Sequence, residues 1–80
     1  MSELKVIKDL VQGTVSIKEN CQYNNIEADV VTVHPYISAR LYGTVKDVII
    51  NKESKIFLHG ELSGNVLNLG GEIHVYAGDK

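Results

Sequence analysis

The sequence contains one cysteine, one proline and only a small excess of negative charge, and these scarcities exclude several classes of protein. The single cysteine, Cys21, cannot form a disulfide within the chain, and it fits a reducing compartment, where a lone thiol is usually a small apolar residue. The 8 basic and 10 acidic side chains are mixed along the chain and give a formal net charge of −2. Because this pattern lacks the basic stripe that phosphate binding needs, we expect no nucleic-acid partner.

A long hydrophobic run is also absent. The uncharged stretch from Leu62 to Gly71 is interrupted by serine, asparagine and glycine, so it does not predict a transmembrane helix, and no signal peptide is predicted either. We therefore expect a cytoplasmic protein that does not bind a membrane. The 80 residues leave room for one domain at most.

The motifs of common enzymes are missing as well. The sequence has no Gly-x-Ser-x-Gly nucleophile elbow, no glycine-rich phosphate loop and no His-Glu-x-x-His metal motif. His59 and His74 have no third ligand at a suitable spacing, whereas structural zinc sites need four ligands close together. We expect a protein that is not an enzyme and that has no cofactor and no bound metal.

What the sequence does contain is a repeat, in which apolar residues recur at every 17th position. Helical periodicity is weak throughout, whereas alternation of apolar and polar residues is clear, for example in Ile56-Phe57-Leu58-His59. Three apolar series follow the interval: Val33/Ile50/Leu67, Ala39/Ile56/Ile73 and Leu41/Leu58/Val75. A repeat this short, made of strand-like segments of about six residues, predicts a β-solenoid whose turns stack about 4.8 Å apart.

Glycine marks the corners of the predicted turns. Five glycines precede an apolar residue by two positions: Gly13, Gly43, Gly60, Gly64 and Gly71. This Gly-x-apolar unit is typical of a corner, an outward residue and then the first inward residue of the next side, so each turn has about three sides. We expect a single domain over 1–80, with an irregular or capping turn over 1–30 and regular turns over 31–77.

The same interval sorts the outward side chains into a strip on one face. Two neighbouring series make up this strip: Arg40/Phe57/His74 and Tyr42/His59/Tyr76. One interpretation is an interaction surface, because a phenylalanine outside the solenoid is costly unless something covers it. The other is a structural ladder, in which stacked neighbours stabilise one another by about 0.2–1 kcal/mol each. A similar ladder is predicted for Asn51 and Asn68 at a corner.

The last turn is the predicted self-association end. An open solenoid exposes unpaired backbone groups and core side chains at its ends, and these recruit another copy unless they are capped. The sequence shows no cap here, since Ile73 to Ala77 is strand-like almost to the last residue. The apolar residues assigned to this end are Leu67, Leu69, Ile73 and Val75.

The stretch from Asp29 to Gly78 resembles the bactofilins. The similarity lies in Ile-Ser-Ala-Arg-Leu-Tyr-Gly-Thr-Val at 37–45, in Val-Ile-Ile at 48–50 and in His-Gly-Glu-Leu-Ser-Gly-Asn-Val at 59–66. The resemblance implies a single-stranded, right-handed, three-sided β-helix, which at this length has about 4–5 turns. It also implies a bacterial cytoskeletal scaffold that polymerises end to end without nucleotide. We accordingly expect a self-associating structural protein whose main partner is itself.

Two other functions are compatible with the sequence. One is a small adaptor or phage-encoded β-helical module that binds another protein through the strip. The other is a fragment of a left-handed hexapeptide-repeat acyltransferase, favoured by the spacing of six and by Ile50 to Lys55 as one hexapeptide. The following hexads lack a regular small residue at the fifth position, which counts against the acyltransferase.

Overall fold

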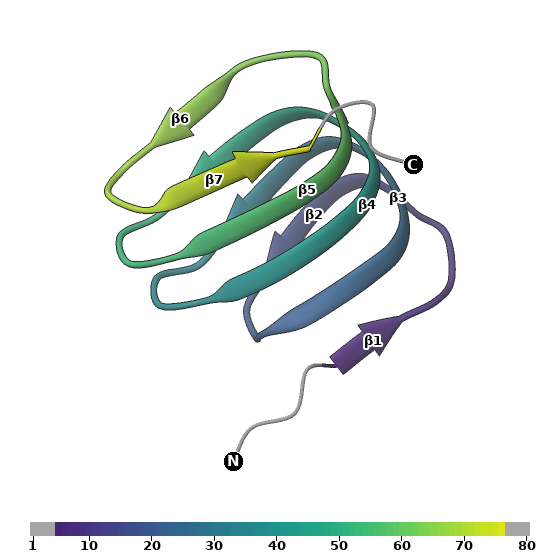
Figure 1. Ribbon diagram of the computed structural model, residues 1–80, viewed down its shortest axis with the longest axis horizontal. Coiled ribbons are helices and arrows are strands. Elements are labelled where there is room, and N and C mark those ends of the chain that lie inside the picture. Colours follow the sequence, from purple (N-terminus) through teal and green to yellow (C-terminus); the bar gives the residue numbers. More distant parts are fainter. Residues whose placement is uncertain (1–4, 77–80) are drawn as a thin grey trace.

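The computed structural model describes residues 5–76, and every element in this range is a strand. The strands are β1 (Lys5–Ile7), β2 (Val11–Ile17), β3 (Cys21–Val33), β4 (Ser38–Ile50), β5 (Lys55–Leu62), β6 (Val66–Asn68) and β7 (Glu72–Val75). All the strand pairs are parallel, and the ribbon winds as a solenoid (Figure 1). The predicted all-β solenoid is confirmed. Residues 5–76 contain no helix of the length and hydropathy needed to cross a bilayer.

Each turn of the solenoid has three short sides. The first sides are 5–7, 21–23, 39–41, 56–58 and 73–75; the second are 11–13, 26–28, 43–45 and 60–62; the third are 15–17, 31–33, 48–50 and 66–68. The chain crosses the front of the molecule from left to right and returns behind it while it rises from β1 to β7, so the winding is right-handed (Figure 1). It completes about four turns, and β7 begins the next one.

The core lies inside the stack of turns, where each side contributes one or two inward apolar side chains. Ile56 and Leu58, for example, are fully buried in register with Ala39 and Leu41 of the turn before. Burial of a side chain of this size contributes about 1.5–3 kcal/mol. The buried apolar residues are Val15, Ile17, Cys21, Tyr23, Ile26, Ala28, Val31, Val33, Ala39, Leu41, Val45, Val48, Ile50, Ile56 and Leu58.

The amino-terminal part is irregular in spacing but belongs to the solenoid body. Val33 pairs with Ile17 at a sequence interval of 16, and Leu41 pairs with Tyr23 at an interval of 18. The register shifts at Gly13/Thr14 and after Tyr23, where an extra residue is accommodated. The intervals between paired residues before residue 31 therefore vary from turn to turn. β3 runs continuously through residue 31, and residue 77 lies outside the described residues.

One predicted core residue, Leu67, is on the wrong face. The interval lengthens to 18 before β6, so that Val66 pairs with Val48 and Leu67 pairs with Ile49 on the outside. The extra residue is held at the corner by Asp47, whose Oδ1 accepts a hydrogen bond of 2.9 Å from the backbone N–H of Asn65. The inward position of the last third side is therefore occupied by Val66.

The corner between the first and second sides requires glycine. Gly43 and Gly60 stack directly on each other, with φ of +146° and +155°. A Cβ on Gly60 would lie 1.8 Å from the backbone oxygen of Gly43, and a Cβ on Gly43 would lie 2.0 Å from that of Ile26. Consecutive turns can approach to the spacing of a parallel sheet at this corner only because neither residue has a side chain.

At the corner after the third side, residues with a positive φ stack on successive turns. Tyr36 and Glu53 have φ of 65° and 60°, and Gly70 has φ of 124° at the next repeat. The backbone N–H of Tyr36 donates to the carbonyl of Lys52 and that of Glu53 to the carbonyl of Gly70. Glycine is the residue that adopts this conformation without strain, so Tyr36 and Glu53 hold the backbone at a cost.

The predicted ladder of Asn51 and Asn68 is wrong, because the two amides have different partners. Asn51 donates through Nδ2 to the carbonyl of Val33 at 2.7 Å. Asn68 Oδ1 accepts from the N–H groups of Gly70 and Gly71 at 2.9 and 2.8 Å, and its Nδ2 donates to the Gly71 carbonyl. The lengthened interval before β6 places Asn68 opposite Ile50, so it closes its own corner instead.

Candidate functional site

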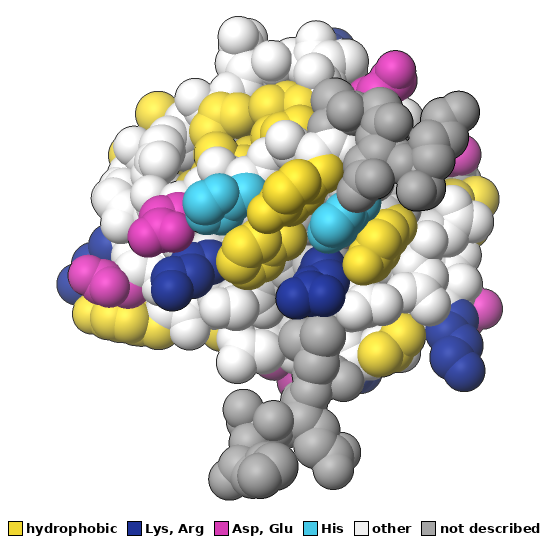
Figure 2. Space-filling model, in the orientation of Figure 1, with side chains coloured by type: hydrophobic (Ala, Val, Ile, Leu, Met, Phe, Trp, Pro, Cys, Tyr) yellow, Lys and Arg dark blue, Asp and Glu magenta, His cyan; other side chains and the backbone are white. Residues whose placement is uncertain are grey.

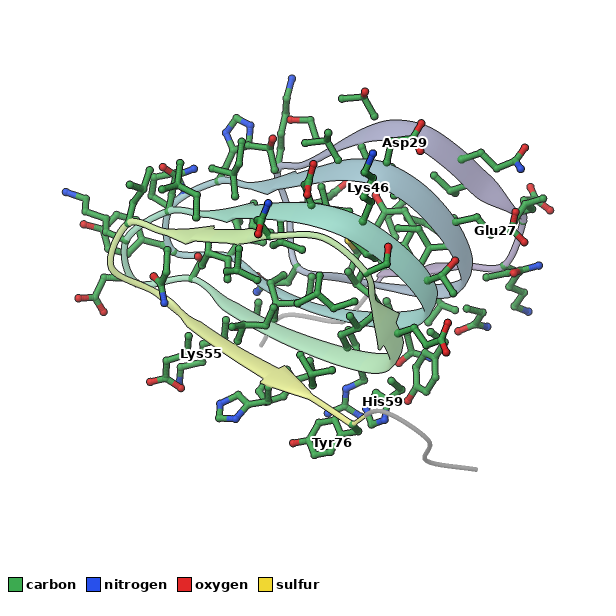
Figure 3. All side chains as sticks on the ribbon, turned by 90° about the horizontal axis from the view of Figure 1, so that it is seen from above. Glu27, Asp29, Lys46, Lys55, His59 and Tyr76 are labelled. Atoms are coloured by element: carbon green, nitrogen blue, oxygen red, sulfur yellow. The ribbon has the colours of Figure 1, made fainter. Side chains whose placement is uncertain are left out.

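The strip of Arg40, Tyr42, Phe57, His59, His74 and Tyr76 forms one continuous surface across β4, β5 and the chain from β7 to Tyr76. Arg40, Phe57 and His74 are in register on successive turns, as are Tyr42 and His59. Figure 2 shows the two histidines on the front face of the molecule with yellow hydrophobic side chains between them. Figure 3 shows His59 and Tyr76 side by side on the same edge. All six predicted residues are thus brought together.

The rings of the strip stack face to face along the solenoid. The centroids of Tyr42 and His59 are 4.6 Å apart, and those of His59 and Tyr76 are 4.7 Å apart, with interplanar angles of 10° and 16°. Phe57 and His74 are 5.2 Å apart at 8°, and the Arg40 guanidinium lies 5.9 Å from the Phe57 ring centroid. These distances follow from the spacing of parallel strands. The stacking directs ring edges to solvent and stabilises the fold by about 0.5–1.5 kcal/mol per pair.

Charged side chains border the strip on one side. Lys55 and Glu72 are in register next to it, two residues before Phe57 and His74. Glu72 Oε1 lies 3.3 Å from Nε2 of His74. Within residues 5–76, neither Arg40 nor Lys55 forms a salt bridge. Arg40 and Lys55 therefore have no carboxylate partner within the described chain. Glu72 has one carboxylate oxygen near His74.

The carboxyl-terminal end of the solenoid is open and apolar. Val66 and Val75 are 36% and 40% exposed, although their register places them directly above the buried residues Val48 and Leu58. Ile73 is partly buried above Ile56. Figure 2 shows hydrophobic side chains at this end, between β6 and β7. These three side chains are in core register, and no further turn of residues 5–76 covers them.

The backbone at this end has a free strand edge. The N–H groups of Glu72 and Tyr76 donate toward β5, to the carbonyls of Ser54 and Leu58 at 2.8 Å. Since alternate residues of a strand point their N–H and C=O groups to opposite sides, those of Ile73 and Val75 point away from β5. No described strand pairs with that side of β7 or with the far side of β6. The end can therefore accept another strand.

The predicted self-association end is partly reassigned by this geometry. Ile73 and Val75 lie at the end in core register. Leu67 and Leu69 are 54% and 52% exposed, but Leu67 faces outward beside Ile49. A constant interval of 17 does not identify Val66 as an inward residue, because the interval is 18 at this corner. The unit Gly64-Asn65-Val66 is the signal for it, because this unit places the apolar residue inward.

The opposite end of the solenoid is more polar. Lys5 occupies the first-side position below Cys21, where later turns have alanine or isoleucine. Its Nζ lies 3.3 Å from Glu19 Oε2, and both side chains are largely exposed. This one charge makes the addition of an apolar turn less favourable here than at the carboxyl-terminal end, although the neighbouring inward residues Ile7 and Val11 are apolar.

Cys21 and Tyr23 are buried together near this end. Cys21 is 2% exposed, and burial raises the pKa of its thiol. Burial, with the neighbouring thiol, raises the pKa of Tyr23 to about 12. Cys21 is therefore a core residue in the structure, as expected for a lone thiol.

The remaining polar surface includes an open hollow of about 430 Å³ along the corner between the second and third sides. Glu27, Asp29 and Lys46 border it (Figure 3). Residues 5–76 contain no group of three side chains of the metal-binding types close enough to hold an ion.

A comparison of the chain with protein family models, curated proteins and solved structures finds no match.

Proposed function

We propose that this protein is a self-associating structural scaffold, a polymer subunit of the bactofilin kind that assembles without nucleotide. The observation that carries the proposal is the open carboxyl-terminal end, where Val66, Ile73 and Val75 continue the core without a covering turn in the described chain. A second copy that stacks there buries apolar surface and pairs the free strand edges at the same time. No chemical step is needed for this contact.

The two neighbouring residues Val66 and Leu67 provide a matched test. A glutamate at Val66 places a charge over the core at the open end, whereas a glutamate at Leu67 adds the same charge on the outer surface of the same strand. We expect Val66→Glu to abolish assemblies seen by sedimentation velocity and negative-stain electron microscopy, and Leu67→Glu to retain them. Circular dichroism checks that both variants keep their β spectrum. If Val66→Glu assembles as the wild type does, end-to-end stacking is refuted.

A second candidate function is a protein-binding adaptor that uses the Tyr42/His59/Tyr76 column. The specific observation in its favour is that these three rings form an ordered stack at the surface. Discrete monomers or dimers in the same micrographs would favour the adaptor over the scaffold. The left-handed acyltransferase fragment is not retained, because the solenoid winds to the right.

A further inference from the structure

The strip and its charged border form a regular grid of outward side chains. Three successive turns, represented by β4, β5 and the chain from β7 to Tyr76, each contribute three positions, so the grid has three rows along the solenoid. The rows are Ser38/Lys55/Glu72, Arg40/Phe57/His74 and Tyr42/His59/Tyr76. The charges are asymmetric along the solenoid, because Arg40 is on the first strand of the grid and Glu72 is on the last.

The spacing of the grid limits the kind of partner that fits it. Ring centroids recur every 4.6–5.2 Å along the solenoid. An extended peptide lying along the same direction repeats at about 3.3 Å per residue and does not match, whereas another stack of parallel strands repeats at about 4.8 Å and does. A second copy of this chain, lying side by side, presents side chains at the required spacing on every turn.

Charge decides how the second copy is oriented. If the two solenoids run in the same direction, with the row of Phe57 on the two-fold axis, Arg40 faces Arg40 of the other copy. If they run in opposite directions, with β5 on the axis, Arg40 faces His74 and each β5 residue faces itself, so that Phe57 meets Phe57 and Lys55 meets Lys55. Cations therefore face each other in both arrangements, and only in the second does a carboxylate of the other copy's grid lie near them. In the second arrangement, each Glu72 lies one turn, or about 5 Å in the plane of the contact, from Lys55 of the other copy. It lies two residues along the strand, or about 7 Å, from Arg40 of the other copy.

We propose that the grid is a lateral contact between two copies of this chain that lie antiparallel, with β5 on the two-fold axis. The antiparallel arrangement gives Arg40 and Lys55, which form no salt bridge within residues 5–76, a carboxylate from the other copy. It also covers Phe57 with a second aromatic ring. This inference deepens the proposed function and rests on it, since it joins two end-to-end polymers side by side.

The size of the grid explains why such a contact acts in polymers. Three turns of about 4.8 Å and five residues of about 3.3 Å give a footprint of roughly 240 Å² per copy. A stable interface buries about 800 Å² per partner, so one pair of grids binds weakly. Copies aligned by end-to-end stacking present several grids at once, and their contacts add up through effective concentration.

Disulfide trapping tests the contact and its direction. Residues of β5 face themselves across the proposed axis, so Lys55→Cys should form a cross-linked dimer, whereas Arg40→Cys should not. In the parallel arrangement the opposite holds, because Arg40 faces itself and Lys55 faces the row of His59. Lys46→Cys is the matched control, since Lys46 is exposed on the opposite side of the molecule from Lys55 (Figure 3).

We expect Lys55→Cys to yield at least about five times more disulfide dimer than Lys46→Cys under mild oxidation, with thiols blocked before denaturing electrophoresis. Arg40→Cys should stay at the control level by itself and cross-link when mixed with His74→Cys. Equal yields for Lys55→Cys and Lys46→Cys, or faster cross-linking of Arg40→Cys alone, would overturn the proposal.

The two proposals fail separately under these measurements. Sedimentation of the reduced Lys55→Cys protein reports end-to-end assembly, and repeating the trapping in a Val66→Glu background reports the lateral contact with the ends blocked. Assembly without cross-linking refutes the lateral contact alone. Cross-linking without assembly refutes the end-to-end scaffold alone.

Discussion

Replacing Gly60 with alanine tests whether the close approach of turns at the glycine corner holds the solenoid together. The new Cβ would lie 1.8 Å from the backbone oxygen of Gly43, little more than half of the 3.4 Å at which ordinary van der Waals contact begins. The obstacle is backbone, so it cannot rotate away. Relief requires the two turns to separate by about a third of their spacing of about 4.8 Å.

The expected cost combines backbone strain and lost pairing. A φ of +155° is outside the range that L-residues adopt readily, and such a conformation costs about 1–2 kcal/mol. Separation of the turns also breaks about two ladder hydrogen bonds of about 1 kcal/mol each. The total of about 3–4 kcal/mol is a large share of the roughly 4–12 kcal/mol that stabilises a domain of this length.

Urea unfolding followed by circular dichroism measures this loss. Gly13→Ala is the matched control, because Gly13 also has a positive φ, of +86°, but an added Cβ there meets no atom within 4 Å. We expect Gly13→Ala to cost about 1 kcal/mol, from strain alone, and Gly60→Ala to cost at least about 2 kcal/mol more or to prevent folding. If Gly60→Ala and Gly13→Ala unfold at the same urea concentration, then close packing of the turns is not the reason why position 60 needs glycine.

Two further predictions concern backbone strain and alkaline stability. Glu53→Gly should raise the stability by about 0.5–1 kcal/mol, seen as a melting temperature higher by about 4 °C, because φ of 60° costs nothing for glycine; Glu53→Ala, which removes only the charge, should give no gain, and an equal gain would contradict the strain. Stability should also fall as the pH rises from about 10 to about 12, since the pKa of Tyr23 is raised from 10.0 to about 12 by burial and the unfolded chain ionises first. The loss of about 2–3 kcal/mol, measured by urea unfolding at each pH, should be smaller in Tyr23→Phe, and an equally steep fall in that variant would show that Tyr23 is not its source.

The architecture is predictable because a solenoid is a repetitive structure. Each turn contacts only its neighbours, so a residue and its partner recur at a nearly constant interval, as in Ala39, Ile56 and Ile73. The same regularity predicts the strip, since outward residues between inward ones must stack. Gly43 and Gly60 are predictable as corners for the same reason.

The predictions that are wrong concern a corner that changes length. Adding one residue at a corner reverses which residues of the next side face inward, because the side-chain period of a strand is two. A constant interval therefore misplaces Leu67 and Asn68 and overlooks Val66. The insertion depends on the hydrogen bond from Asn65 to Asp47, which joins two turns and has no periodic signature in the sequence.

Periodicity and glycine placement are local properties of the chain, and they suffice to establish that it forms stacked parallel turns and which face of most strands is buried. Three features are set by packing between turns instead: the length of each corner, the choice of Val66 over Leu67 as the residue that completes the core at the open end, and the ring distances and angles in the stack of Tyr42, His59 and Tyr76. These features depend on how one turn rests on the next. That relation is fixed by hydrogen bonds and close contacts between residues a full turn apart, which a constant sequence interval of 17 does not record.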